Sequence, residues 1–407
     1  MNSAIKKMNT STLHLSNMKL VLRLIKDSGQ ISRSDITNFT GLTPPTVTKI
    51  IDSLVFNYKL VDYVGIGTSN GGRPPVIVRF KNETNYIIGI DLGATYIRGC
   101  LTDLDANFIS EIQVPTEIEK GSNHIINKVL NIVNRFCEKQ GAEVKIWGVG
   151  IGVAGLVNKK TGVIEASPDF GWSHIDLQKE IGKKIDIPIF YDNSTRLMAL
   201  GELYFNKKSK IMDFAIINVG YGIAAGLVIH GNLVKGHAGF AGEFGHIPVD
   251  TCSPVQCKCG MNGCLEALAS GHRIANMGKK ALKSNSNSML FKLSEGKPEL
   301  VSAETVGNAA KQGDEAALRI FEEVGDYLAK GIGVLTNLLN PEVIYIGGGI
   351  SLNGKFFFDL VNQKASAYLL PPNKGLKILP STFRENATAI GAVSLVMEKI
   401  MNLELSN

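Results

Sequence analysis

Two neighbouring stretches carry the most specific chemistry of this chain: Gly236-His237-Ala238-Gly239-Phe240-Ala241-Gly242-Glu243-Phe244-Gly245-His246 and Cys257-Lys258-Cys259-Gly260-Met261-Asn262-Gly263-Cys264-Leu265-Glu266. Three thiols lie within eight residues, and a histidine precedes the first thiol by eleven residues. One nitrogen and three sulfurs form a tetrahedral ligand set that is typical of Zn²⁺, and two glycines between the thiols allow a tight turn. Buried free thiols or a Cys257–Cys264 disulfide are the alternatives. The spacing favours a single zinc site made of His246, Cys257, Cys259 and Cys264.

The same stretches contain two carboxylates, Glu243 and Glu266, which can accept hydrogen bonds from the hydroxyl groups of a ligand. His246 can bind a metal through one ring nitrogen and face a ligand with the other. A surface salt bridge is the alternative role for each carboxylate, although glycine and other small residues surround Glu243. We therefore expect these three residues to line a polar ligand site.

Upstream of these stretches, strands alternate with helices from Tyr86 onward. Residues 86–91 and 99–103 are predicted to be paired strands. The turn between them, Asp91-Leu92-Gly93-Ala94-Thr95, would let backbone N–H groups approach a phosphate. A tight hairpin needs the same glycine, so this signal is weak by itself.

Three more glycine-rich segments follow, at 148–155, 220–226 and 347–349. The first is expected to be a loop after a strand. No helix opens at its end, so the sequence does not predict a dinucleotide-binding Rossmann unit there. The third follows a predicted buried strand at 343–346. Two strand-rich units, each opening with a glycine turn, indicate two related lobes around a cleft.

The excess positive charge lies entirely at the N-terminal end. Residues 1–85 contain eleven Lys and Arg against five Asp and Glu, whereas the whole chain contains 43 and 37. The remaining residues are therefore neutral overall. A basic small domain on a neutral body predicts a polyanionic partner, with a solvated surface as the alternative.

Residues 17–80 have the pattern of a winged helix–turn–helix. A helix is predicted at 17–26, and Ser32 with Asp35 resembles the capping box of a second helix that ends at Gly41. Thr43 is expected to cap a third helix, which begins with two prolines. Its core-facing residues recur at helical spacing: Val47, Ile50, Ile51 and Leu54.

After this third helix, strands at 60–64 and 76–80 are expected to flank a glycine-rich wing tip at 65–72. Small hydroxyls and one lysine on the outer face of the helix suit the major groove, and an arginine beside the wing suits the minor groove. A small helical domain that binds protein is the alternative. The predicted DNA-contacting residues are Ser32, Arg33, Thr43, Pro45, Thr46, Thr48, Lys49 and Arg73.

The length of 407 residues predicts more than one domain, because a single core rarely grows past about 250–300 residues. The N-terminal residues lack the apolar segment and cleavage site of a signal peptide. The apolar run at 214–229 contains Asn218 and glycines and is shorter than the roughly 20 residues of a membrane span. We expect a cytoplasmic protein with no membrane partner.

With these motifs the chain resembles the ROK family (repressors, open reading frames and kinases) over nearly its whole length. The resemblance implies an α/β protein. An N-terminal winged helix–turn–helix would precede a two-lobed, actin-like and ribonuclease-H-like fold of the sugar-kinase type. The expected domains are 1–85 for the winged helix, 86–195 for the first lobe, 196–390 for the second lobe with the zinc loop, and 391–407 for a C-terminal helix that packs back on the body.

The resemblance also implies roles for single residues. It makes the Zn²⁺ structural, because the metal would fix the loop that presents the two glutamates and His246. It adds Asp169 and Asn193 to the sugar site, although the family usually has asparagine at the position of Asp169. The positions implied for residual nucleotide binding are Asp91, Gly93, Thr95, Gly220, Gly222 and Gly348.

The chain departs from the kinases of the family at the position of the general base. These kinases read roughly Glu-Asn-Asp-Ala-Asn before a helix that ends in Gly-Glu. Aligned on Gly201-Glu202, this chain reads Asp192-Asn193-Ser194-Thr195-Arg196. Ser194 then occupies the base position and cannot accept the proton near neutral pH. Tyr221 replaces a threonine of the phosphate loop. No catalytic residue and no kinase activity are expected.

We therefore expect a sugar-responsive transcription regulator, in particular a repressor of carbohydrate-utilisation genes. Its partners would be double-stranded operator DNA and a small sugar, and it would form a homodimer or a dimer of dimers. The first alternative is an active ATP-dependent sugar kinase with a fused DNA-binding domain. The second is a winged-helix protein whose body only mediates assembly, against which the two glutamates and His246 argue.

Overall fold

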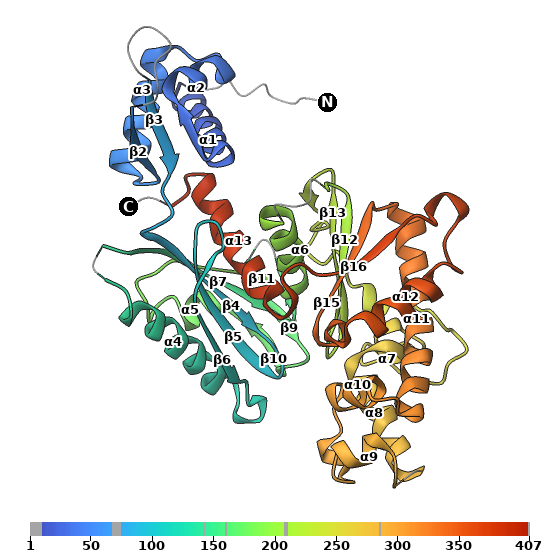
Figure 1. Cartoon of the computed structure of the whole chain (residues 1–407). Helices are drawn as coiled ribbons and strands as arrows, with labels where there is room; N and C mark the ends of the chain where they lie inside the picture. The colour runs from blue at the N-terminus through green and yellow to red at the C-terminus, as the bar shows by residue number, and fades with distance from the viewer. Residues whose placement is uncertain are drawn as a thin grey trace.

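The computed structural model describes residues 10–66, 75–141, 143–158, 161–206, 211–284 and 286–405. An N-terminal domain precedes two α/β lobes. It lies beside the C-terminal end of the last helix, drawn in red in Figure 1. Within the described residues, no helix combines the length and the apolarity that a membrane span requires.

The N-terminal domain has three helices, α1 (Thr10–Ser28), α2 (Arg33–Thr40) and α3 (Pro44–Asp52), the last extended by the turn η1 (Ser53–Asn57). Its antiparallel sheet has the order β1-β3-β2. The strands are β1 (Gln30–Ser32), β2 (Val61–Ile66) and β3 (Val76–Phe80). Three helices followed by a β-hairpin form the winged helix–turn–helix arrangement that the sequence predicted. The wing tip predicted at 65–72 lies largely outside the described residues.

Local capping rules account for the helix ends of this domain. Asp35 N donates to Ser32 Oγ over 3.0 Å at the start of α2, and Gly41 ends that helix with a φ of 68°. This backbone bond is one of the two hydrogen bonds of a capping box, and Ser32 Oγ in addition donates to the Asp35 carboxylate. Thr43 is the N-cap of α3 as predicted, but its hydroxyl pairs with that of Thr46 instead of a backbone N–H.

The first lobe is a five-stranded sheet of order β11-β7-β4-β5-β6, in which β4, β7 and β11 are parallel and β4 to β6 antiparallel. Helix α4 packs on one face of this sheet and α13 on the other. A small antiparallel sheet and the short helix α5 complete the lobe. The bounds are β4 (Asn85–Leu92), β5 (Tyr96–Asp103), β6 (Phe108–Pro115), α4 (Ser122–Glu138), β7 (Lys145–Val153), β8 (Leu156–Val157), β9 (Ile164–Ser167), β10 (Trp172–Ile175), α5 (Leu177–Glu180), β11 (Ile189–Asn193) and α13 (Ala387–Met401).

The glycine-rich segment at 148–155 is not a loop, which corrects the prediction. Gly148, Gly150 and Gly152 lie inside β7, on the face that contacts α13. A Cβ atom on Gly150 would lie 2.0 Å from the carbonyl oxygen of Ala392. Alternate glycines therefore allow the helix backbone to lie directly on the strand.

The second lobe is a five-stranded sheet of order β14-β13-β12-β15-β16. Successive residues of β12 alternate between two hydrophobic clusters, one with α6 and one with α11 and α12, so helices cover both faces. The bounds are α6 (Ser194–Phe205), β12 (Phe214–Val219), β13 (Ile223–Ile229), β14 (Asn232–Leu233), η3 (Phe244–His246), α7 (Leu265–Ala269), α8 (Gly271–Ala281), α9 (Met289–Leu293), α10 (Ala303–Lys311), α11 (Glu315–Leu339), β15 (Val343–Gly347), η6 (Gly349–Asn353), α12 (Lys355–Ala365) and β16 (Lys377–Pro380).

Helices α6 and α13 cross where the two lobes meet (Figure 1). At the crossing a Cβ atom on Gly391 would lie 1.9 Å from the carbonyl oxygen of Leu197, so the two helix backbones are in contact. Glu202 near the end of α6 is buried and accepts hydrogen bonds from the hydroxyls of Ser381 and Thr382. This carboxylate ties α6 to the segment that leads into α13.

The N-terminal domain shares its hydrophobic core with the body. Val21 of α1 and Ile50 of α3 belong to the same buried cluster as Met397 and Ile400 of α13. At the junction, the buried Asn85 accepts a hydrogen bond from Trp147 Nε1 at 2.8 Å. It also donates to the carbonyl groups of Lys81 and Lys59. The winged helix is therefore packed on the first lobe and on the end of α13.

Candidate functional site

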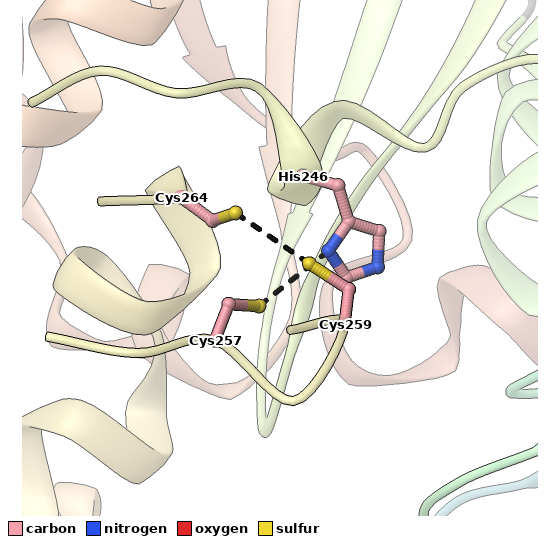
Figure 2. Close-up of side chains that lie close together, drawn as sticks. All are labelled: His246, Cys257, Cys259 and Cys264. Atoms are coloured by element: carbon pink, nitrogen blue, oxygen red, sulfur yellow. Dashed lines mark hydrogen bonds between the residues drawn. The ribbon is translucent and has the colours of Figure 1, made fainter. Parts of the chain in front are cut away.

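The cluster predicted to bind metal is assembled in the second lobe. His246 ends η3 and Cys264 directly precedes α7, while the other two cysteines lie on the loop between them. Figure 2 shows the four side chains pointing toward one another. The structure thus brings together all four predicted ligands, and no disulfide joins them.

The donor atoms of this cluster fit one tetrahedral metal ion. They all lie within 4.8 Å of one another. Sulfur atoms bonded to one Zn²⁺ at about 2.3 Å lie about 3.8 Å apart. The Cys259 and Cys264 sulfurs are 3.7 Å apart, and Cys257 Sγ is 3.6 Å from His246 Nδ1. The cluster could therefore bind one metal ion with shifts of about 1 Å or less in its side chains.

The loop that carries Glu243 is fixed by the glycine before it. Gly242 has a φ of 97°, and its carbonyl group accepts a hydrogen bond from Ala225 N of β13 at 2.8 Å. A Cβ atom at this position would lie 1.9 Å from the Ala225 oxygen. Only glycine fits here, so Glu243 leaves the β13 edge in one defined direction.

Glu266, in the first turn of α7, is held by the glycine turn between β12 and β13. Its Oε2 atom accepts a hydrogen bond from Ile223 N at 2.9 Å. A Cβ atom on Gly222 would lie 2.4 Å from the same oxygen. One carboxylate oxygen of Glu266 is therefore engaged by the backbone.

Asp169 and Glu243 both lie close enough to Glu266 for its charge to affect their pKa values. Burial raises the pKa of Glu243; His246 and Arg196 oppose this shift, and the Glu266 charge adds to it. Burial also raises the pKa of Asp169. The Lys258 ammonium group, whose Nζ atom lies 3.9 Å from Asp169 Oδ1, opposes this shift, and the Glu266 charge adds to it. Of the predicted sugar-site residues, Asp169 and Glu243 thus both lie near Glu266, and Glu243 also lies near His246.

The side chain of Asn193 serves mainly as a helix cap. Its Oδ1 atom accepts hydrogen bonds from the backbone N–H groups of Thr195 and Arg196, which begin α6. Its Nδ2 atom donates to the carbonyl group of Gly155 at 2.9 Å. One amide hydrogen is left for a ligand, which is a smaller role than the sequence predicted.

An ion pair at the start of α6 was missed in the sequence. Arg196 is 4% exposed, and its Nε atom donates to Asp192 Oδ1 at 3.0 Å; Nη2 contacts the same carboxylate atom. Nη1 donates to the carbonyl oxygen of Gly239, in the loop before Glu243. Asp192 lies in β11 and Arg196 in the first turn of α6, so the helical rule for residues four apart did not apply to this pair.

This ion pair borders a cavity of about 130 Å³ between the lobes. A larger hollow of about 920 Å³ separates α1 from the second lobe. Lys235 lines both spaces, because the segment after β14 forms a wall between them. The lining of the smaller cavity consists of Val157, Asn158, Gly162, Tyr191, Asp192, Arg196, Lys235 and Gly239.

Tyr221 lies between two side chains that the sequence analysis did not single out. Its ring centroid is 5.3 Å from that of His272, and the Lys258 ammonium group is 4.7 Å from the ring. Tyr221 is 45% exposed, so the ring is partly in contact with solvent. Three bulky side chains therefore occupy the space above this turn.

The expected nucleotide-binding residues lie in two separate places. Asp91, Gly93 and Thr95 form the hairpin between β4 and β5 of the first lobe, where burial raises the pKa of Asp91 to about 6 and Arg98 opposes the shift. In the second lobe, a Cβ atom on Gly348 would lie 2.3 Å from Asn218 Oδ1. The turn at Gly348 therefore packs beside the end of β12, next to the turn that contains Gly220 and Gly222.

Most of the predicted DNA-contacting residues lie on one surface of the N-terminal domain. Thr43, Pro45 and Lys49 are exposed, and Thr46 and Thr48 are partly exposed. Arg73 lies outside the described residues.

Two predicted DNA contacts have other roles. Ser32 is 4% exposed, because its hydroxyl caps α2, so it is not on this surface. Arg33 donates hydrogen bonds to Asp52 and to the hydroxyl of Tyr63 and is therefore engaged within the domain.

Known sequences place the body in one family. The ROK family profile matches residues 87–399. The xylose repressor of Caldicellulosiruptor bescii is 30% identical over 399 residues, covering 97% of this chain and 98% of that protein. The glucokinase of Thermotoga maritima is 32% identical over 316 residues, covering 77% of this chain and 98% of the enzyme.

Solved structures show the same two groups. A ROK family transcriptional regulator, described as a homolog of the E. coli MLC protein, superposes with a TM-score of 0.80. It is 26% identical and covers 96% of this chain and 98% of that one. A ROK family glucokinase from Streptomyces griseus in complex with glucose and AMPPNP gives a TM-score of 0.70 at 27% identity, covering 76% and 98%. The likeness to this regulator spans nearly the whole chain, whereas the likeness to this glucokinase spans about three quarters of it.

Proposed function

We propose that this chain, which belongs to the ROK family, is a sugar-responsive transcription repressor that binds operator DNA through its winged helix. One observation carries the proposal: a basic winged helix is packed on a body that keeps the carboxylates and the metal ligands but has Ser194 at the base position. The full-length likeness to xylose repressors supports it.

In this proposal, the sugar occupies the cleft and its hydroxyl groups donate to Glu243, Glu266 and Asp169. A homodimer or a dimer of dimers would place two winged helices on the two half-sites of an operator. The sugar must bind the arrangement that does not fit DNA more tightly than the one that does, because equal affinity would shift nothing.

The sugar and DNA functions are tested together with the full-length protein. Glu243→Gln and Glu266→Gln should lose the thermal stabilisation that a panel of sugars gives the wild type, while retaining affinity for the promoter DNA of a neighbouring sugar operon. Glu315→Gln, an exposed change at the start of α11, is the matched control. A normal sugar response in both cleft variants, or no retardation of DNA by the wild type, would refute the proposal.

We propose that the cluster in the second lobe binds one structural Zn²⁺ per chain. His246, Cys257, Cys259 and Cys264 would hold the ion, which would fix the loop between Glu243 and Glu266. Cys259→Ser should reduce zinc content and sugar binding together, whereas Cys252→Ser, at an exposed cysteine outside the cluster, should preserve both. Elemental analysis that finds no zinc in protein purified without chelators would contradict this assignment.

Loss of kinase activity is the remaining part of the proposal, and the likeness to glucokinases makes a kinase the second candidate. A general base typically contributes a factor of about 10²–10⁴ in rate, and Ser194 cannot supply it. With ATP, Mg²⁺ and its effector sugar, the wild type should release no ADP above background. Ser194→Asp alone should restore little, because Tyr221 still occupies the phosphate loop. Wild-type turnover of about 1–100 per second would establish the kinase instead.

A further inference from the structure

The outward face of α3 carries prolines, threonines and a single lysine, so that ring and methyl carbons are exposed beside hydroxyls. Val47, Ile50 and Ile51 are fully buried, so the opposite face of the helix points to solvent. Pro45 is exposed on that face and Thr48 partly so. A pyrrolidine ring and a threonine methyl group are thus available to a partner in the major groove.

The helix lacks the side chains that read bases through paired hydrogen bonds. Guanine is read mainly by Arg or Lys, adenine by Asn or Gln, and cytosine by Asp or Glu. Residues 43–49 contain none of these except Lys49. Thr43 Oγ1 and Thr46 Oγ1 lie 2.9 Å apart and bond to each other, which engages the two hydroxyls at the start of the helix.

The start of α3 is also a poor site for a phosphate. A helix N-terminus binds anions through its free backbone N–H groups. The first two helical residues here are Pro44 and Pro45, which have no N–H group. The first turn therefore offers an apolar surface where many recognition helices offer N–H donors.

Among the described residues, Arg33 lies beside the end of α3 and is engaged within the domain. Arg33 donates to Asp52 and to the Tyr63 hydroxyl, and the Tyr63 hydroxyl donates to the same Asp52 oxygen. This arrangement neutralises Asp52, the carboxylate at the end of α3, and keeps the guanidinium away from a base. Lys49 is then the one cation that α3 presents outward.

We propose that α3 reads the C5-methyl groups of thymines, so that Pro45 and Thr48 select thymine-containing steps on either side of a single Lys49 contact. The inference rests on the proposed function and adds the chemical feature of the operator that the helix recognises. Apolar contact with the thymine methyl is the readout that remains when bidentate hydrogen bonding is absent.

The test removes the methyl groups without changing base pairing. The full-length protein is used to select duplexes from a random 20-bp pool (about two helical turns). Each thymine of the selected duplex is then replaced singly by deoxyuridine. Burial of one methyl corresponds to about a fourfold change in affinity. We expect a loss of about fourfold at the few thymines beneath α3 and none at the others.

Two variants of one residue sharpen the test. Thr48→Ser removes the methyl and keeps the hydroxyl, whereas Thr48→Val keeps a methyl in that place and removes the hydroxyl. Thr48→Ser should weaken binding to the thymine duplex and cost nothing further on the deoxyuridine duplex. Thr48→Val should retain wild-type discrimination. Circular dichroism and urea unfolding confirm that both variants fold.

The outcomes separate this inference from the proposed function. Equal affinity for thymine and deoxyuridine duplexes, or a small loss spread evenly over all thymines, overturns methyl readout but leaves a DNA-binding repressor. Failure to enrich any duplex from the pool overturns the repressor itself.

Discussion

Two residues near the start of α6 bear on whether this body can catalyse phosphoryl transfer. Ser194, which we propose replaces the general base of the family's kinases, is followed two residues later by Arg196, which forms a buried ion pair with Asp192. Asp192 is thereby committed to a guanidinium and to Asn193 N, so it is a poor substitute for the missing base. Removing Arg196 would leave a carboxylate unpaired in the interior, which is strongly destabilising.

Asp91 gives a prediction about stability and pH. Burial raises its pKa from 3.8 to about 6, so the folded protein favours the protonated form. The folded state loses stability as the pH rises from about 4 through about 6, because the unfolded chain releases the proton first. Asp91→Asn should therefore raise the free energy of unfolding near pH 7 by up to about 3 kcal/mol and leave it unchanged below about pH 4.

Urea unfolding at the two pH values measures this difference. Asp359→Asn, at an exposed aspartate of α12, is the control and should change stability little at either pH. A variant that is equally stable or less stable than the wild type near neutral pH would show that Asp91 is better accommodated than its burial implies.

Glu243 gives a prediction about ligand binding. Its raised pKa means that it takes up a proton at a higher pH than an ordinary glutamate. A protonated carboxyl group is a weaker acceptor for sugar hydroxyls. Sugar affinity, followed by calorimetric titration, should therefore fall as the pH is lowered from neutral, and Glu243→Gln should bind weakly at every pH. A wild-type affinity independent of pH would contradict this role.

The residues of the site differed in how well the sequence revealed them. The metal ligands lie within one short stretch, so their spacing alone predicted the cluster that the structure contains. Arg33 and Asn193 are each engaged by partners that the sequence did not indicate. Arg33 donates to Asp52 and Tyr63. Asn193 caps the start of α6 and donates to the carbonyl group of Gly155. Such competition for a side chain depends on tertiary packing and cannot be read from one segment.

Strand β7 shows the corresponding limit for a secondary-structure element. Its glycines were interpreted as a loop because glycine is common in turns. The period of two in Gly148, Gly150 and Gly152 was the signal of a strand on which another backbone packs closely. The capped helices α2 and α3, in contrast, were predictable because caps involve residues only a few positions apart.

The contact between β7 and α13 yields a prediction about stability. In Gly150→Ala the new methyl group would meet the Ala392 carbonyl, a backbone atom that cannot move without shifting the helix. Overpacking of this kind costs about 1–3 kcal/mol, occasionally more. Gly375→Ala, where no atom lies within 4 Å of the added carbon, is the matched control. Chemical denaturation should show a large loss for the first variant only, and equal stability of the two would refute the close contact.

Over the whole chain, α6 and α13 join the two lobes, and α13 also supports the winged helix. A movement of the lobes about the α6–α13 crossing would therefore reach α1 through packed side chains. The hollow of about 920 Å³ beside α1 leaves room for such a movement.

The shared core predicts how the protein melts. Because the winged helix and the first lobe belong to one hydrophobic cluster, calorimetry should show them unfolding in a single transition. Operator DNA should then raise the melting temperature of the body as well as that of the N-terminal domain. A separate early transition, reproduced by an isolated fragment of residues 1–85, would show that the domain folds by itself.

Packing of α1 against α13 also restricts how such proteins can exchange parts by recombination. A crossover near residue 85 would import a foreign winged helix and retain the old Met397 and Ile400, which lie more than three hundred positions away in the sequence. The imported core would meet side chains that were never selected to fit it. Successful chimaeras should therefore need a second exchange in the last turns of α13, and the two ends of the gene should be inherited together.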